Sequence, residues 1–234
     1  MPGLVDSAER ILRTSERSLT AVSNNVSNVS TSGYKRQATF LQAINDQING
    51  SYTDVAVDSD TSQARFVRST NPLNMAISGP GFFRVRNESG IFYTREGHFQ
   101  LKADGTVTTP NGFVLQQADG NDLILDGTDV EILPDGMVMD DGRPVGQIGV
   151  FAPTEAVRMT PIAGSLFTAD ERGMEASRGG QLRQGMVEGS NVDLGEEMVT
   201  MMTAVRDAES GARLIQVYDD LIGRAITTFG QGAR

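Results

Sequence analysis

The sequence carries an apolar helical stripe at each end, and these two stripes most constrain how the chain can fold. Between residues 190 and 229, apolar residues recur at spacings of mostly four and three, which places them on one face of an α-helix. Asp193 stands where an N-cap is expected. At 1.5 Å per residue such a helix is about 54 Å long. A narrow stripe over several heptads requires a second helix along it. The stripe consists of Leu194, Met198, Met201, Val205, Ala208, Ala212, Ile215, Ile222, Ile226 and Phe229.

A second stripe lies at the other end of the chain. One such pattern usually means an amphipathic helix packed on its own domain. Because two patterns flank a β-like middle, we predict instead that the terminal helices pair as a coiled coil. Small residues at Ala8 and Ser15 would allow close approach but bury little area, so neighbouring chains would supply the missing burial. The stripe runs through Val5, Ala8, Leu12, Ser15, Leu19, Val22, Val26 and Val29.

Between the stripes the period of the pattern changes to two, which is typical of β-strands. Candidate strands from about residue 64 to 188 include FFRVR at 82–86 and IFYTR at 91–95. Asp-Gly and Asn-Gly dipeptides separate them, as in hairpins. We predict an all-β, hairpin-rich barrel or sandwich. The turn dipeptides are Asp104-Gly105, Asn111-Gly112, Asp119-Gly120, Asp126-Gly127, Asp135-Gly136 and Asp141-Gly142.

Residues 34–63 show little periodicity, and we interpret them as part of an extended connector. Phe40, Leu41, Ile44 and Ile48 could form a short helix within it. The predicted fold class is therefore α+β, with an all-β domain inserted between two paired helices. The predicted parts are a helix over 1–33, a connector over 34–70, a β domain over 71–188 and a helix over 189–234.

Composition and charge exclude several functions. A formal net charge of -10 argues against nucleic-acid binding, because phosphates would be repelled. No window approaches the ~18 apolar residues of a membrane span, so no membrane insertion is expected. The chain has no Cys, which removes disulfides and thiolate metal sites. The first ten residues contain acids and no continuous apolar core, so we expect no cleavable secretory signal.

The sequence offers no enzyme site, metal site or cofactor site. His98 is the only histidine and alternates with apolar residues, which favours a structural or surface role. Glu196 and Glu197 open a helix, where the helix dipole alone explains carboxylates. The acidic run at 119–129 superficially resembles a calcium-binding repeat but lacks its nine-residue period, so turn aspartates explain it. No nucleophile and base can be paired with any specificity.

Four motifs together resemble one family, the axial proteins of the bacterial flagellum, and within it the basal-body rod proteins of the FlgF and FlgG type. They are SNNVSNVSTSGYKR at 23–36, AISGPGFF at 76–83, YTREGHF at 93–99 and GSNVDL at 189–194, the last followed by EMV at 197–199. The segment DGRPVGQIGV at 141–150 and the short chain look more like the proximal rod type, FlgF. Gly211 and Gly223 are departures, since each costs roughly 1 kcal/mol in a helix interior.

The resemblance implies a mechanical function. Relatives pair their terminal helices into an inner coiled-coil tube and project a β domain outward. The implied role is a subunit of a hollow, torque-transmitting rod within the periplasm, which assembles with its own copies and with other rod proteins. It would leave the cell uncleaved through the flagellar type III export apparatus. Predicted assembly residues are Leu12, Leu19, Val22, Asn25, Val26, Asn28, Tyr34, Met198, Met201, Val205, Ile215, Ile222 and Phe229.

Two alternatives stay open from the sequence. One is the distal rod protein of the same family, and the other is a secreted β-domain adhesin or enzyme with a helical stalk. A hook-type subunit is disfavoured, because the chain is too short for the extra outer domain.

Overall fold

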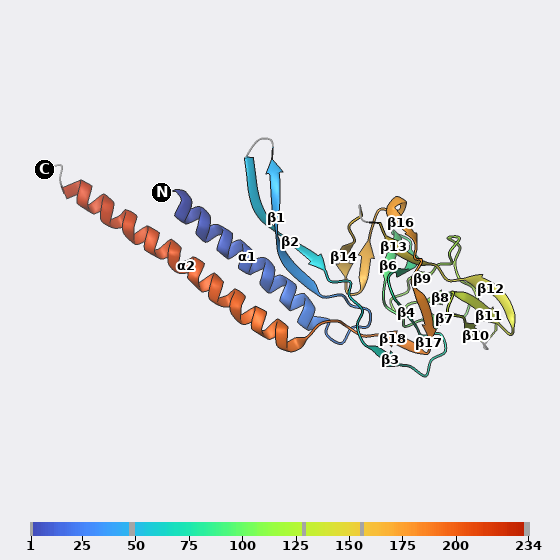
Figure 1. Ribbon diagram of the computed structural model, residues 1–234. Helices are drawn as coiled ribbons and strands as arrows, with labels where there is room; N and C mark the ends of the chain where they lie inside the picture. Colours follow the sequence, from blue (N-terminus) through green and yellow to red (C-terminus); the bar gives the residue numbers. More distant parts are fainter. Residues whose placement is uncertain (1, 47–49, 128–129, 155–156, 232–234) are drawn as a thin grey trace. The chain divides into compact units, whose positions relative to one another are not determined.

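The computed structural model describes residues 2–46, 50–127, 130–154 and 157–231, and it has the predicted α+β composition (Figure 1). The chain forms two compact units. A helical unit comprises residues 1–27, 37–58 and 193–234, and a β unit comprises residues 28–36 and 59–192. The four parts predicted from the sequence divide the chain differently from these two units, and that division stays a prediction.

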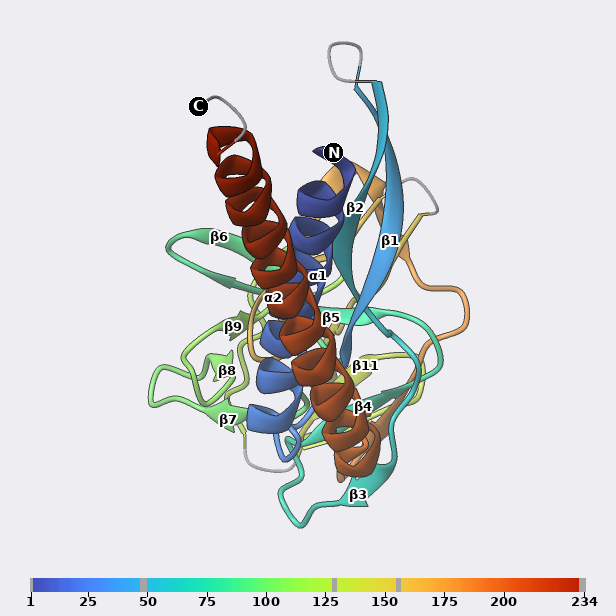
Figure 2. The ribbon, with the colours of Figure 1, turned by 90° about the vertical axis from the view of Figure 1, so that its left-hand side faces the viewer.

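The helical unit is built on two long helices that lie side by side and run antiparallel (Figures 1 and 2). They are α1 (Pro2–Ser27) and α2 (Leu194–Gln231). Asp193 caps α2, because its Oδ1 accepts the backbone N–H of Gly195 at 2.7 Å and of Glu196 at 3.1 Å. The two terminal helices are confirmed, whereas the regular supercoil of a coiled coil stays a prediction. Neither helix combines the length and apolar character needed to cross a bilayer within the described residues.

Small residues form the contact face of α2 toward α1. Ala204 and Gly211 are buried seven residues apart, and a Cβ built on Gly211 would lie 3.1 Å from Leu12 Cγ. On α1, Ala8, Ser15 and Val22 are buried with the same spacing, which agrees with the predicted stripe. On α2, only some residues of the predicted apolar stripe lie on this contact face. The helices therefore approach closely at Gly211, which explains a glycine that helix propensity disfavours.

The connector contains a two-stranded sheet, so the predicted short helix is wrong. Residues 37–46 form strand β1 (Gln37–Asp46), which pairs with β2 (Gly50–Ser59), and β1 packs against α1. Ile48, the last residue of the predicted helix, lies outside the described residues. Short apolar runs do not distinguish helix from strand by periodicity, and pairing with β2 decided the outcome here.

Antiparallel sheets make up the β unit. The largest follows the order β14-β15-β6-β5-β9-β8-β7, with β13 joining β5 and β16 joining β13. The described strands close into no barrel, and a sandwich stays a prediction. This sheet contains β5 (Phe82–Asn87), β6 (Gly90–Thr94), β7 (Gln100–Leu101), β8 (Val107–Thr108), β9 (Val114–Leu115), β13 (Val150–Pro153), β14 (Thr160–Ala163), β15 (Leu166–Thr168) and β16 (Met174–Ala176).

Smaller sheets complete the unit. β10 (Val130–Ile132), β11 (Met137–Asp140) and β12 (Arg143–Gln147) form a meander. β3 (Phe66–Arg68) pairs with β18 (Met186–Glu188), and β4 (Met75–Ser78) pairs with β17 (Gln181–Gln184). A short 3₁₀ helix, η1 (Glu171–Gly173), precedes β16.

The turn dipeptides work largely as predicted. Asp141 and Gly142 both have positive φ, at 48° and 74°, and they connect the paired residues Asp140 and Arg143 of β11 and β12. Two positive φ values in a two-residue turn are the type I′ pattern that suits a hairpin. Gly127 is the exception, since it is not among the glycines with positive φ.

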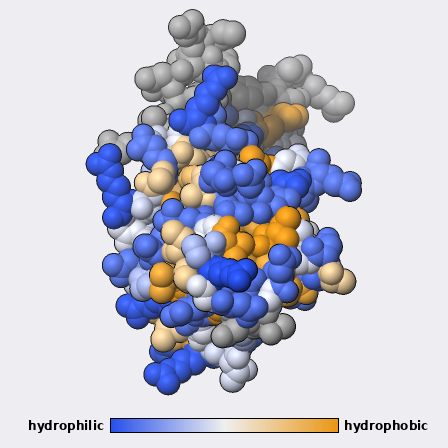
Figure 3. Space-filling view, turned by 90° about the vertical axis from the view of Figure 1, so that its right-hand side faces the viewer, coloured by the Kyte–Doolittle hydropathy of each residue, from blue (hydrophilic) through white to orange (hydrophobic). Residues whose placement is uncertain are grey.

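The core of the β unit is apolar and tightly packed. Phe83 and Phe99 meet edge to face with ring centroids 5.4 Å apart, among buried residues such as Met75 and Leu115. The unit therefore has a core of its own. The face of the molecule drawn in Figure 3 is mostly hydrophilic, with small apolar patches between polar residues.

We predict that a large side chain at Gly211 separates the two helices. Gly211→Leu should lower the free energy of unfolding of the helical unit by about 1–3 kcal/mol through overpacking against Leu12 and Ile11. Gly223→Leu is the matched control, because a Cβ at Gly223 meets nothing within 4 Å. Thermal unfolding followed by circular dichroism at 222 nm would compare them. Equal stability of the two variants would contradict the proposed close contact.

Candidate functional site

A buried carboxylate binds two buried cations in the β unit. Glu188, at the end of β18, is fully buried. Its Oε1 accepts from Lys35 Nζ at 2.6 Å and from the backbone N–H of Ala64 at 2.8 Å. Its Oε2 accepts from Arg95 Nη1 at 2.9 Å. We call Lys35, Arg95 and Glu188 the charge cluster.

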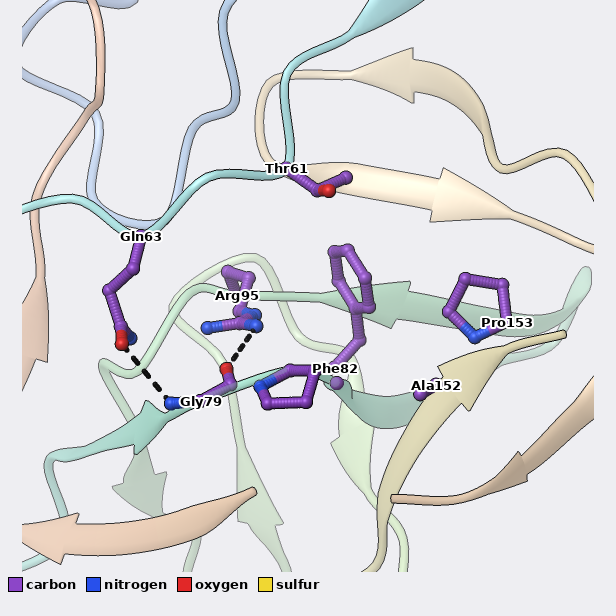
Figure 4. Close-up of a pocket in the computed structure, with 9 residues that line it drawn as sticks. Thr61, Gln63, Gly79, Phe82, Arg95, Ala152 and Pro153 are labelled. Atoms are coloured by element: carbon purple, nitrogen blue, oxygen red, sulfur yellow. Dashed lines mark hydrogen bonds between the residues drawn. The ribbon is translucent and has the colours of Figure 1, made fainter. Parts of the chain in front are cut away.

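Backbone carbonyls accept further hydrogen bonds from both cations of the cluster. Lys35 Nζ donates to Ser62 O at 2.7 Å, and Arg95 Nη2 donates to Gly79 O at 2.7 Å (Figure 4). The Phe82 ring lies 5.2 Å from the Arg95 guanidinium carbon. Burial lowers the pKa of Lys35 and of Arg95, and Glu188 opposes this shift in both. The carboxylate therefore favours the charged form of both buried cations.

The backbone around the cluster is equally constrained. Gly33 N donates to Glu188 O at 2.8 Å. Gly33 has φ of +69°, and a Cβ there would lie 2.3 Å from the backbone of Arg95. Asn191 Oδ1 accepts from Arg36 N at 2.7 Å. Only glycine fits at residue 33.

The four sequence motifs meet at this cluster. Lys35 comes from the 23–36 motif and Arg95 from the 93–99 motif, while Gly79 belongs to the 76–83 motif. Glu188 immediately precedes the motif at 189–194, and Asn191 within it binds Asp60 O through Nδ2 at 2.8 Å. The residues that carry the family resemblance thus join the segments by which the chain enters and leaves the β unit.

A shallow pocket of about 400 Å³ lies beside Arg95 (Figure 4). Gln63 Nε2 donates to Ile77 O at 2.6 Å, and its Oε1 accepts from Gly79 N at 3.1 Å. Phe82 and Pro153 line the apolar side of the pocket. Its Gln63 amide and Arg95 guanidinium groups donate to the chain's own carbonyls, so they brace the backbone beside the charge cluster.

His98 lies near the surface of the β unit. Its Nδ1 is 3.8 Å from Glu96 Oε1, and the Ser165 hydroxyl donates to Glu96 Oε2 at 3.4 Å. Burial raises the pKa of Glu96, and His98 and Ser165 oppose that shift. The contacts of His98 are those of a surface side chain beside a carboxylate.

In the helical unit, Asn25 joins three elements. Its Nδ2 donates to Gln37 O at 2.8 Å and to Glu197 Oε2 at 3.0 Å, and its Oδ1 accepts from Gln37 N at 2.8 Å. Both Asn25 and Glu197 are buried. Sequence reasoning missed this role of Glu197. Its seven-residue spacing from Ala204 was the available signal, because the two residues then share one helix face.

The predicted assembly residues fall into three groups. Val22, Asn25 and Tyr34 are buried. The side chain of Phe229 lies outside the described residues, although its backbone belongs to α2. Exposed members are Met198, Met201, Val205 and Ile222, at 36–42%. The half-buried members are Leu12, Leu19, Val26, Asn28 and Ile215.

Further apolar residues of α2 are exposed and were not predicted as assembly residues. Val199 is 65% exposed and Ile226 67%. The sequence places large apolar side chains on two sides of this helix, whereas the prediction included a single stripe. The others are Leu194, Met202, Val217 and Leu221.

Comparisons with known proteins identify the class. Residues 76–140 match the family model described as the flagellar hook protein FlgE/F/G D1 domain, and residues 183–228 match the flagellar basal body rod FlgEFG protein C-terminal. The motifs and the charge cluster lie largely within these two segments. The class is therefore that of structural proteins of the flagellar hook and rod.

Curated relatives narrow the class to one family. The chain is 30% identical to the flagellar basal-body rod protein FlgG of Borreliella burgdorferi and 27% identical to that of Bacillus subtilis, each match covering 87% of this chain and 90% of the relative. It is 26% identical to the flagellar basal-body rod protein FlgF of Caulobacter vibrioides, over 93% of this chain and 94% of the relative. The chain belongs to the flagellar basal-body rod proteins of the FlgF/FlgG type, as the four motifs predicted.

We predict that Glu188 is the most sensitive residue of the charge cluster. Glu188→Gln leaves two buried cations without a charged partner and should cost about 3–5 kcal/mol of unfolding free energy. Urea unfolding of the whole chain would measure this cost. Asp122→Asn is the control, because it breaks a half-exposed pair with Arg86 and should cost at most about 1 kcal/mol. Similar losses in both variants would show that the cluster does not organise the unit.

Proposed function

We propose that this protein is a structural subunit of the flagellar rod at its proximal position, in a hollow helical assembly that transmits torque. The observation that carries the proposal is the set of exposed apolar side chains along α2, which α1 does not cover. Large apolar side chains gathered on an exposed surface mark contacts between proteins. Neighbouring subunits would bury it, and the paired helices would form a coiled-coil inner tube.

The buried and exposed residues then have different roles in assembly. Val22, Asn25 and Tyr34 are buried, so they act by holding the subunit in shape. Met198 and Val205 are exposed and contact neighbouring subunits. The charge cluster contributes rigidity, because displacing Glu188 would leave two buried cations without a charged partner. A rod that transmits torque needs subunits that resist deformation.

The remaining parts of the proposal follow from the family. The chain is exported through the flagellar type III apparatus without a cleaved signal peptide, and it assembles in the periplasm with its own copies and with other rod proteins. It acts mechanically and not as an enzyme, since the relatives are structural rod proteins.

Coverage and one sequence segment favour the proximal rod, whereas sequence identity favours the distal rod. The match to FlgF of Caulobacter vibrioides covers 93% of this chain, against 87% for the two FlgG relatives, which favours the proximal rod. Residues 141–150, which span β12, carry the segment that looks most like the proximal type. The FlgG relatives are slightly more identical, so the distal rod is the second candidate.

Copy number separates the two positions. Quantitative mass spectrometry of purified basal bodies, with the hook protein as internal standard, should give a low copy number that matches one short layer. Several-fold more copies would place the chain in the distal rod. Absence from basal bodies would overturn the proposed function.

We predict that a charge on the exposed α2 face blocks incorporation into the rod. Val205→Asp should abolish swimming, because it places a carboxylate in a subunit contact that must exclude water. Ser210→Asp is the matched control, being exposed on α2 and polar already. Unchanged urea unfolding of both variants would show that folding is intact. Normal swimming of the Val205→Asp strain would contradict the prediction.

A further inference from the structure

The exposed methionines of this chain are gathered in one short segment. Among the methionines that the structure describes, Met198, Met201 and Met202 are exposed, and Met202 has the largest exposed fraction, 58%. Met75 is fully buried, Met174 is buried, and the others are half-buried. The accessible thioether groups therefore lie in the first turns of α2, in a segment of five residues.

These methionines lie on one side of the helix. At about 3.6 residues per turn, Met201 and Met202 are each within about 60° of Met198 round the helix axis. Ala204, which is buried in the contact with α1, lies about 200° further round the helix than Met202. The Met202 side chain therefore projects away from α1. The exposed thioethers belong to the surface that the proposed function assigns to neighbouring subunits.

Thioether sulfurs are the groups of this chain that a peroxide oxidises most readily, because the chain has no Cys and no Trp. Hydrogen peroxide transfers one oxygen atom to the methionine sulfur, which loses two electrons and forms an S=O bond. The O–O bond breaks, and the rest of the peroxide leaves as water. A sulfoxide reductase reverses the change by using a dithiol, which becomes a disulfide while the oxygen leaves as water. The most exposed sulfurs react first.

Oxidation of these side chains is expected to change the surface of the subunit and to leave its fold intact. A methionine sulfoxide is polar, whereas the thioether is flexible and apolar. Water solvates the sulfoxide oxygen on the free subunit, because all of these side chains are exposed there. A contact that excludes water would leave this oxygen without a hydrogen-bond donor, and burying an unpaired polar group is unfavourable. A sulfoxide therefore weakens such a contact.

We infer that Met198, Met201 and Met202 form a site of reversible oxidation by small peroxides, and that the oxidised subunit is withheld from assembly. The inference rests on the proposed function, since it requires that these side chains contact rod neighbours. The site is open to peroxide in the free subunit, and neighbouring subunits close it after incorporation. Reduction of the sulfoxides returns the subunit to the pool that can assemble.

Peptide mapping by mass spectrometry tests the site itself. The purified whole chain is treated with hydrogen peroxide without denaturant, and sulfoxide formation is followed at each methionine. Met198, Met201 and Met202 should oxidise roughly tenfold or more faster than Met75, which is the fully buried control. Chain unfolded in urea should show similar rates at these positions, because the fold no longer shields Met75. Equal rates in the folded chain would overturn the inference.

Substitutions that imitate the two oxidation states test the effect on assembly. Glutamine approximates the length and polarity of methionine sulfoxide, whereas leucine keeps an apolar side chain of similar volume without a sulfur. Met198→Gln, Met201→Gln and Met202→Gln together should give roughly tenfold less incorporation into basal bodies than the three matched Met→Leu substitutions together. Quantitative mass spectrometry of basal bodies measures both, and urea unfolding compares their stabilities. If the glutamine variant is less stable, the pair Met202→Gln and Met202→Leu decides, because Met202 projects away from α1.

The outcomes distinguish this inference from the proposed function. Equal incorporation of the glutamine and leucine variants would overturn the inference and leave the proposed function standing, because the subunit would still reach the basal body. Absence of the natural chain from basal bodies would remove the proposed function itself.

Discussion

The fold of the β unit depends on the burial of one carboxylate, Glu188, between Lys35 and Arg95. A charge removed from water must be paired and hydrogen-bonded. This requirement brings together segments that are up to 153 residues apart in sequence. It also explains the residue types of the family motifs: a lysine and an arginine that bind one carboxylate, and a glycine at residue 33 where the backbone of Arg95 leaves no room for a side chain.

The helical unit follows the opposite principle, because its internal contact uses small residues and leaves large ones outside. Ala204 and Gly211 let the helices approach closely, whereas Met202 and Ile226 remain exposed. A monomeric protein would normally bury its largest apolar side chains first, since they contribute most of the hydrophobic free energy. Under the proposed function, this exposed surface is the one that neighbouring subunits bury.

Sequence reasoning found the elements with strong local signals and missed those without them. The terminal helices and the Asp141-Gly142 hairpin follow from periodicity and from the backbone freedom of glycine. The β1–β2 sheet was missed, because a short apolar run suits either a helix or a strand. β17 is mostly polar, and its pairing with β4, which places Gln181 opposite Ser78 at a separation of 103 residues, has no local signature.

By itself the sequence determined the class of fold, the two terminal helices and the family, because helix periodicity, turn chemistry and motifs are local properties of the chain. Only the tertiary structure decided which face of α2 meets α1, since both candidate faces contain apolar residues at helical spacing. It also revealed that Glu197 binds Asn25 and that Glu188 joins Lys35 to Arg95. A carboxylate's partner depends on distances in space, and residue spacing along the chain does not encode those distances.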